Sequence, residues 1–170
     1  HIVICKDENR LKIIDGKKQL GLEPWGPDSF RVRMSPSHIM DGNDWALTEE
    51  MPFAVLDVEE VTVDTTDPWY KGEEWAKYHS EGKKYIVTNG NIKAVINTEG
   101  WISYYDKQDN LLTCEYWRNR NRINRYAVPL RVDARELKPY PGTEDCELYA
   151  RFEAFPDEKI FGMGQYQDIA

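Results

Sequence analysis

Short apolar runs and turn signals alternate most regularly between residues 85 and 117. The run Tyr85-Ile86-Val87-Thr88 consists of residues that favour β-strands, and Asn89-Gly90 follows it at once. Asn-Gly supplies the two positive-φ positions of a type I′ hairpin turn, so we predict that the chain doubles back here. Similar patterns predict further strands over residues 92–97, 101–105 and 111–117. Four strands joined by short loops form an antiparallel meander, whose apolar face requires a second layer to cover it.

The chain before the meander has the same β character. Residues 2–4 and 11–14 predict a hairpin, and residues 53–58 and 61–63 predict two strands separated by Glu59-Glu60. The segment Glu23–Asp28 contains Pro24, Gly26 and Pro27, so we expect it to interrupt regular structure.

A strict alternation marks residues 29–34, where Phe30, Val32 and Met34 share one face and Arg31 and Arg33 share the other. Two arginines on one face could clamp a carboxylate. The alternative, which we favour, is that they are solvated or ion-paired surface charges.

The chain after the meander is again predicted to form strands. One is expected over residues 126–132, a turn over residues 138–142, and the longest strand of the chain over residues 146–155. In that last strand Leu148, Ala150, Phe152 and Ala154 lie on one side. A sustained 3.6-residue period is found nowhere in the sequence, so the predicted fold class is all-β.

Aromatic residues gather in a polar segment, residues 64–82, that lacks any β alternation. Trp69, Tyr70, Trp75 and Tyr78 could form a platform on which a sugar ring stacks. The alternative is that they pack onto the sandwich or onto a neighbouring domain, because large aromatic side chains are seldom left exposed.

Length and charge narrow the classes of partner. The chain has 170 residues, which predicts one domain over residues 1–170. Its 22 basic and 30 acidic residues give a net charge of −8, which argues against nucleic acid and anionic membrane surfaces as partners. The segment 118–125 holds four arginines and three asparagines, and in this acidic chain we interpret it as a solvated loop.

The three cysteines, Cys5, Cys114 and Cys146, lack the Cys-x-x-Cys spacing of a zinc site. We expect reduced thiols that behave as small buried or half-buried hydrophobes, with no metal and no cofactor. The first residues are too short an apolar stretch for a signal peptide, so a cytoplasmic location is expected. Gly162 and Gly164 do not predict a dinucleotide site, because the third glycine and the βαβ setting are absent.

Several of these motifs occur in a fixed order. Gly100-Trp-Ile-Ser-Tyr-Tyr-Asp106 precedes Leu111-Leu-x-x-Glu115, and Phe152-x-x-Phe155 and Ile160-Phe-Gly-Met-Gly-Gln165 follow later. This order resembles the amino-terminal sandwich of glycoside hydrolase family 31, which includes α-glucosidases and α-xylosidases. Gln165 with Gln167 resembles the α-xylosidase-like branch, whereas many members carry Glu at the first of these positions.

The resemblance implies a galactose-mutarotase-like antiparallel β-sandwich, or supersandwich, that precedes a catalytic (β/α)₈ barrel. In the family both catalytic aspartates belong to the barrel, and the retaining mechanism places them about 5 Å apart. The Asp-Met-Asn-Glu type of motif that carries the nucleophile is absent from this sequence, so we expect no catalytic residue in it. The resemblance also implies that the sandwich is an incomplete fragment, with its sheet partners elsewhere.

The expected partners are the downstream barrel of the same gene product and an α-linked oligosaccharide, and a homo-oligomer is left open. Gln165, Tyr166 and Gln167 are the candidates for residues beside a substrate pocket, with packing at a domain junction as the alternative.

Two other functions remain open. A free-standing carbohydrate-binding module would need Trp69, Trp75 or Trp25 exposed on one surface. An aldose epimerase would need a histidine acid facing a glutamate base, and His1, His38 and His79 fall at a terminus or in loops.

Overall fold

Every helix or strand that the structure describes is a β-strand. The computed structural model describes residues 2–7, 10–35, 57–62, 83–97, 100–116, 132, 134–143 and 145–159. The strands are β1 (Ile2–Asp7), β2 (Arg10–Asp15), β3 (Lys18–Pro24), β4 (Phe30–Ser35), β5 (Asp57–Thr62), β6 (Lys83–Asn89), β7 (Ile92–Ile96), β8 (Ile102–Asp106), β9 (Leu111–Cys114), β10 (Arg135–Pro139) and β11 (Cys146–Ala150). The predicted all-β class is therefore confirmed.

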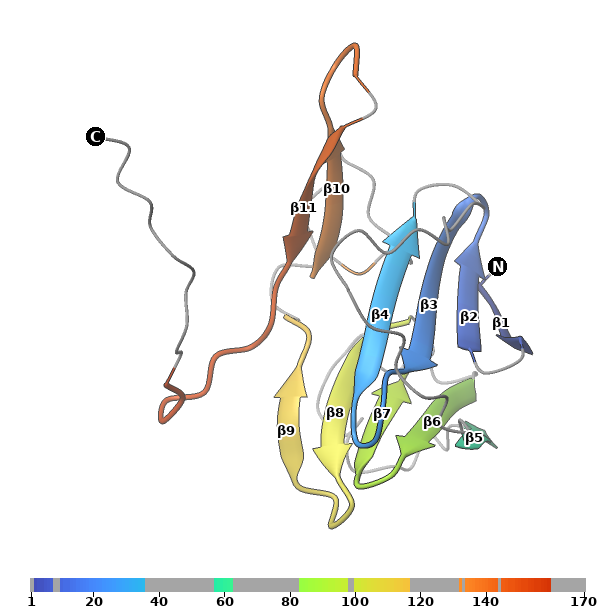
Figure 1. The fold of residues 1–170 in the computed structure, drawn as a ribbon, viewed down its shortest axis with the longest axis vertical. Coiled ribbons are helices and arrows are strands. Elements are labelled where there is room, and N and C mark those ends of the chain that lie inside the picture. Colours follow the sequence, from blue (N-terminus) through green and yellow to red (C-terminus); the bar gives the residue numbers. More distant parts are fainter. Residues whose placement is uncertain are drawn as a thin grey trace.

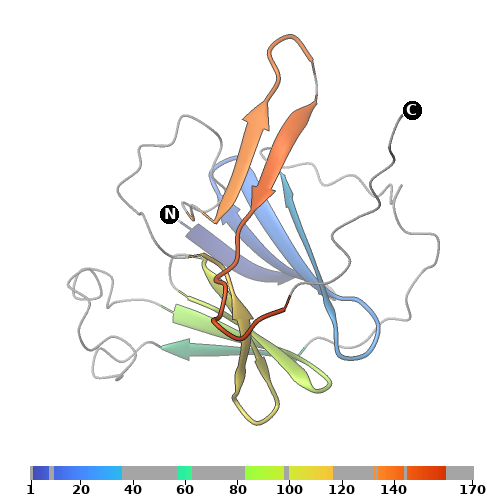
Figure 2. The same cartoon turned by 90° about the vertical axis from the view of Figure 1, so that its left-hand side faces the viewer.

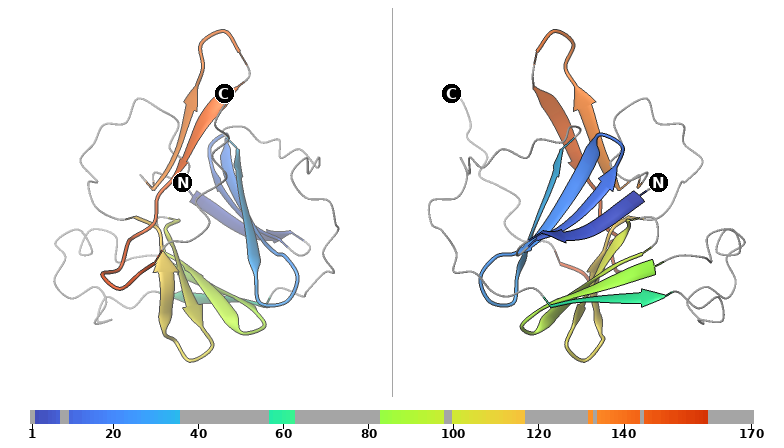
Figure 3. Two further views of the ribbon diagram at one scale, coloured as in Figure 1. Left: turned by 60° about the vertical axis from the view of Figure 1, so that its left-hand side comes forward. Right: turned by 90° about the vertical axis from the view of Figure 1, so that its right-hand side faces the viewer.

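The strands form two larger sheets and a hairpin. One sheet has the order β1-β2-β3-β4, the other has the order β5-β6-β7-β8-β9, and β10 pairs with β11. All neighbours are antiparallel. In Figure 1 the two larger sheets lie face to face, and the β10–β11 hairpin extends beyond one end of them. The turned views of Figures 2 and 3 show the same arrangement.

A single apolar core lies between the two larger sheets. Its buried members from the first sheet are Leu11, Ile13, Leu20 and Leu22, and those from the second are Val87, Ala94, Ile96 and Ile102. Val132 and Ala134, just before β10, complete the core. The meander predicted from residue 85 onward is confirmed as β6 to β9, and the expected covering layer is the first sheet.

The two sheets are also joined by hydrogen bonds between their turns. Asn89, at the end of β6, is buried, and its side-chain amide donates to the carbonyls of Gly26 at 2.9 Å and Ser29 at 2.7 Å. Asp28 accepts a hydrogen bond from the backbone N–H of Asn91 at 2.6 Å. These contacts link the β3–β4 turn to the Gly90-Asn91 turn between β6 and β7.

Three predicted boundaries were wrong. Residues 23 and 24, expected to interrupt regular structure, belong to β3, where Pro24 pairs with Phe30. A proline is tolerated there because β2 pairs with β3 only as far as Leu22, so Pro24 owes no hydrogen bond to β2. Glu59 and Glu60 do not break a strand but lie inside β5, at the edge of its sheet, where both side chains stay exposed to water.

The third wrong boundary concerns the hairpin. Strand β10 was not predicted, and the expected turn at 138–142 starts later, since Pro139 is still paired with Cys146. Strand β11 has five residues, fewer than the seven of β3 and β6, so it is not the longest. After Ala150 the ladder gives way to an isolated bridge between Phe152 and Glu115. The strand predicted over residues 126–132 lies outside the described residues except for Val132.

Candidate functional site

The residues predicted to contact a sugar cannot be placed. Gln165, Tyr166, Gln167, Trp69 and Trp75 all lie outside the described residues, so their roles remain predictions.

One of the three tryptophans weighed for a binding module is described. Trp25 is half-buried, and the Arg31 guanidinium lies 3.7 Å from the centre of its ring. That face of the indole is therefore occupied by a cation–π contact within the chain.

The most deeply buried charges in the described part of the chain are Glu115, just after β9, and Arg135, the first residue of β10. Their relative exposures are 5% and 2%. Arg135 Nε donates to Glu115 Oε1 at 2.6 Å, and Arg135 Nη2 donates to Oε2 at 2.8 Å. This two-pronged geometry suits a guanidinium and a carboxylate, and it compensates both buried charges.

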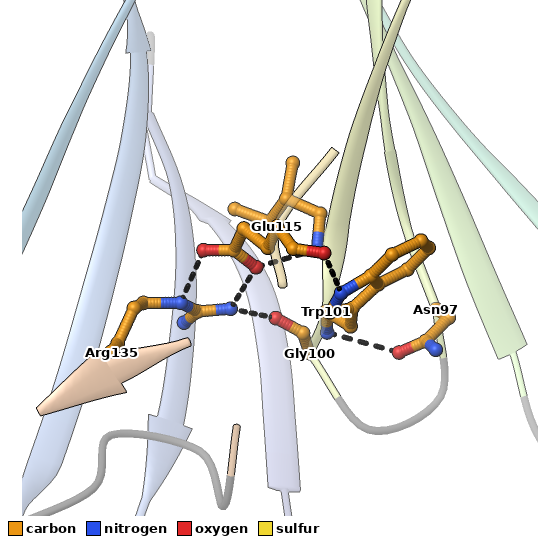
Figure 4. Close-up of polar contacts among 6 residues, drawn as sticks. Asn97, Gly100, Trp101, Glu115 and Arg135 are labelled. Carbon is orange, nitrogen blue, oxygen red and sulfur yellow. Dashed lines mark hydrogen bonds and ion pairs between the residues drawn. The ribbon is translucent and has the colours of Figure 1, made fainter. Parts of the chain in front are cut away.

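The same ion pair fixes the loop between β7 and β8 (Figure 4). The backbone N–H of Ile102 donates to Glu115 Oε2 at 2.8 Å, and Arg135 Nη2 also donates to the carbonyl of Gly100. The indole N–H of Trp101 donates to the backbone carbonyl of Glu115 at 2.7 Å. Glu115 and Arg135 thus join the loop, β9 and the projecting hairpin.

The chemistry available at this junction is structural. Both oxygens of the Glu115 carboxylate accept hydrogen bonds from charged or backbone donors of the fold itself. Burial, with the nearby charge of Glu115, raises the pKa of Tyr104. Burial likewise raises the pKa of the Cys114 thiol, together with Glu153 and Glu115, so the sulfur stays protonated and is a poor nucleophile.

A second buried carboxylate, Glu23 of β3, lies among three arginines. Arg10 Nη2 is 3.0 Å from Glu23 Oε2, while the Nε atoms of Arg31 and Arg33 are 2.5 Å and 3.0 Å from Oε1. Burial alone would raise the pKa of Glu23, but the hydrogen bond from Arg31 and the three positive charges hold that pKa below its ordinary value. Of the two predictions for Arg31 and Arg33, ion pairing is confirmed, and the carboxylate they hold belongs to the neighbouring strand.

The third buried carboxylate, Glu136, follows the same rule. It lies 2.7 Å from Nη2 of Arg151. Within the described ranges, each buried carboxylate is therefore paired with at least one arginine. The same residues contain no group of three His, Cys, Asp or Glu side chains that could hold a metal ion, and no helix among them is long and apolar enough to cross a membrane.

The three cysteines are free thiols. Cys114 is buried as expected, but Cys5 and Cys146 are exposed, so the prediction of buried or half-buried side chains was wrong for these two. Cys146 pairs with Pro139 at the end of the hairpin next to its turn, where both residues are exposed.

Sequence reasoning missed Glu115 and Arg135 as a pair. Glu115 did stand out, because it ends the Leu-Leu-x-x-Glu motif. Arg135 carries no local signal, since nothing in a single sequence shows which residue twenty positions away will meet it.

Two curated proteins with sequences similar to this chain carry the names of glycosidases. No protein-family model matches the sequence. The chain is 33% identical over 157 residues to "Uncharacterized family 31 glucosidase ORF2" of Pseudescherichia vulneris. That alignment covers 87% of this chain and 26% of the relative. The chain is 29% identical over 170 residues to "Alpha-xylosidase A" of Aspergillus niger, covering 93% of this chain and 20% of the relative.

A solved structure agrees with the sequence relatives. The crystal structure of a GH31 α-xylosidase from a soil metagenome, complexed with xylose, matches 98% of this chain with a TM-score of 0.70 and 35% identity. The match covers 22% of that chain. The present chain thus spans about a fifth to a quarter of the length of these relatives.

Proposed function

We propose that this chain, whose homologues are family 31 glycosidases, acts as the non-catalytic amino-terminal β-sandwich of a retaining α-glycosidase. The observation that carries the proposal is the match to 20–26% of relatives that are far longer. The arginine pairing of each buried carboxylate in the described residues supports it, because a general acid or nucleophile needs a carboxylate open to substrate.

In this proposal the sandwich braces a catalytic barrel that lies elsewhere in the full-length protein. The barrel supplies the two aspartates for the double displacement, and the sandwich borders its sugar pocket. The substrate is a terminal α-xylosyl or α-glucosyl residue. The names of the relatives, which include two α-xylosidases, favour α-xylosides.

Steady-state assays on the full-length gene product test this function. We expect hydrolysis of aryl α-xylosides or α-glucosides with retention of anomeric configuration. Replacing a barrel aspartate should abolish kcat. In contrast, Glu136→Gln should leave kcat per folded molecule within about twofold, because Glu136 pairs with Arg151 inside the sandwich and has no part in the proposed chemistry. An inactive full-length protein, or a large loss of kcat in a folded Glu136→Gln variant, would contradict the proposal.

We also propose that Gln165, Tyr166 and Gln167 line the edge of the pocket. Gln165→Ala should then raise KM for the aryl glycoside several-fold with a smaller change in kcat. A contact that is equally strong in the enzyme–substrate complex and in the transition state affects substrate binding but not kcat. Tyr140→Ala, at an exposed position of the β10–β11 turn, is the matched control. Equal KM values in the two variants would place these residues in structural packing instead.

A further inference from the structure

Strand β11 presents its apolar residues to solvent. Leu148 is 56% exposed and Phe152, just beyond the strand, is 51% exposed, and Ala150 between them is exposed as well. The alternate residues Glu147 and Tyr149 are half-buried on the opposite face. This is the reverse of the arrangement that a strand at the surface of a finished domain adopts.

The polar face of the hairpin is fully engaged, which fixes the way β11 faces. Arg151 pairs with Glu136 at 2.7 Å, Lys138 lies 3.5 Å from Glu147, and the Tyr149 hydroxyl donates to Glu147. A half-turn of the strand that buried Leu148 would break all of these contacts. The register of β10 and β11 therefore determines that the apolar face of β11 is the exposed one.

The same face of the hairpin is already covered along β10. Leu137 stands directly opposite Leu148 in the ladder, and residues opposite each other share a face. Leu137 is only 6% exposed, and Arg135, opposite Ala150, lies in the buried ion pair. One continuous face thus runs from the interior along β10 to open solvent along β11. Figure 1 shows β10 and β11 side by side, with the hairpin extending beyond one end of the two larger sheets.

We propose that the β11 face, defined as Leu148, Ala150 and Phe152, is covered in the full-length protein by an apolar segment of the same polypeptide outside residues 1–170. The inference rests on the proposed function. Relatives of which this chain covers 20–26% have ample further sequence to supply that segment. The β11 face lies next to the buried side chain of Leu137. A segment packed on this face would therefore enlarge the existing apolar core around Leu137.

A second copy of this chain fits the face less well. Each copy carries a net charge of −8, and pairing two copies through this face would bring like charges together. A segment of the same polypeptide is present at high effective concentration near the face, and its binding does not require two negatively charged copies to approach each other.

Thiol labelling of the full-length protein tests the proposal. Cys146 lies on the same side of β11 as the β11 face, two residues before Leu148, and Leu148→Cys places a second probe within that face. We expect maleimide to modify both thiols at least about tenfold more slowly than in the urea-unfolded protein, as read by peptide mass mapping. Thr143→Cys, in the exposed turn of the same hairpin, should label at close to the unfolded rate.

Two outcomes would overturn the proposal. The first is labelling of both probes at the rate of the Thr143→Cys control. The second is protection that disappears on dilution together with a dimer-to-monomer change in sedimentation, which would identify a second copy as the cover. Assaying glycosidase activity on the same preparation separates this inference from the proposed function, because an active protein with unprotected probes contradicts only the docking.

Discussion

At the scale of single residues, Gly90 shows how a turn in one sheet is fitted to the other. Its φ is +61°, a value that side chains rarely adopt, and a Cβ atom there would overlap the carboxylate of Asp28. That carboxylate accepts the hydrogen bond from Asn91 that joins the two turns. The glycine is therefore needed both for the backbone conformation and for the close approach.

Gly90→Ala should destabilise the protein by about 2 kcal/mol or more, because it adds a steric conflict to the backbone strain. Gly16→Ala is the matched control: its φ is +62°, yet nothing lies within 4 Å of an added Cβ. We expect that variant to lose only about 1 kcal/mol. Urea unfolding followed by circular dichroism measures both, and equal losses would mean that the contact with Asp28 contributes nothing.

Arg135 is the residue whose removal should cost most. Arg135→Met keeps much of the side-chain volume but leaves the Glu115 carboxylate buried without its cation. Breaking one side of a buried ion pair typically costs about 3–5 kcal/mol. We expect a loss of that size in the free energy of unfolding, measured by urea titration.

The control for Arg135→Met is an exposed ion pair. Asp109, 78% exposed at its side chain, pairs with Lys93. Asp109→Asn keeps a residue that tolerates the positive φ of 67° found there, so only the charge is lost. A change below about 1 kcal/mol is expected. Equal losses in the free energy of unfolding for the two variants would show that burial does not strengthen the contribution of the Glu115–Arg135 pair to stability.

At the scale of elements, Glu23 ties three strands together. It lies in β3 and contacts Arg10 of β2 and Arg31 and Arg33 of β4. Because its pKa in the folded state lies below the ordinary value of 4.5, the folded state binds fewer protons than the unfolded chain. The stability that Glu23 contributes is thus present above about pH 4.5 and is lost as the pH falls through the lowered pKa.

Glu23→Gln should therefore lower the free energy of unfolding at neutral pH by about 2 kcal/mol. The difference from the parent protein should shrink as the pH falls below the ordinary carboxyl value of 4.5, where the parent loses the same charge. Urea midpoints of both proteins across this range give the comparison. A difference that stayed constant with pH would show that the charge of Glu23 does not stabilise the fold.

Strands were predicted correctly where the preferences of neighbouring residues determine the backbone conformation. They were missed where pairing with other strands determines it. A tight turn after β6 was predictable because Asn-Gly favours one. Its predicted form was wrong: Asn89 pairs with Ile92 as the last residue of β6, the loop is Gly90-Asn91, and of Asn89, Gly90 and Asn91 only Gly90 has a positive φ. Strand β3 was missed, since Pro24 looks like a break and Gly21 weakens strand propensity. Gly21 is held between Lys12 of β2 and Arg33 of β4, and Pro24 is held by its pairing with Phe30 of β4.

At the scale of the whole molecule, the two larger sheets share one core. Ile13 of the first sheet and Ile96 of the second are both fully buried in the same cluster. Neither sheet can keep its apolar face covered if the other unfolds. The two sheets should thus unfold in one cooperative step.

Ile13→Ala and Ile96→Ala should each cost about 2–5 kcal/mol and should each shift the whole transition. Circular dichroism and tryptophan fluorescence should give coincident curves for both variants. Val3→Ala, at an exposed position of β1, should change the free energy of unfolding by less than about 0.5 kcal/mol. Separate transitions for the two sheets would contradict a shared core.

The predicted site shows the limit of the sequence most plainly. The motif around Gln165 pointed to a sugar pocket through a resemblance, and the tryptophans of residues 64–82 pointed to sugar stacking through their aromatic rings. Both lie outside the described residues. The burial and ion pairing of Glu23, Glu115 and Glu136 were not predicted, because only the fold brings arginines to these carboxylates.

The sequence by itself determined the all-β class, the order of the meander from β6 to β9, and the alternation of faces in β4 and β11, because turn propensities and a two-residue period act over a few neighbouring positions. Only the tertiary structure decided which face of each strand is buried. Leu137 and Leu148 follow the same pattern and lie side by side, yet one is interior and the other meets solvent. Burial depends on what lies across from a strand, and that is set by segments distant in the chain.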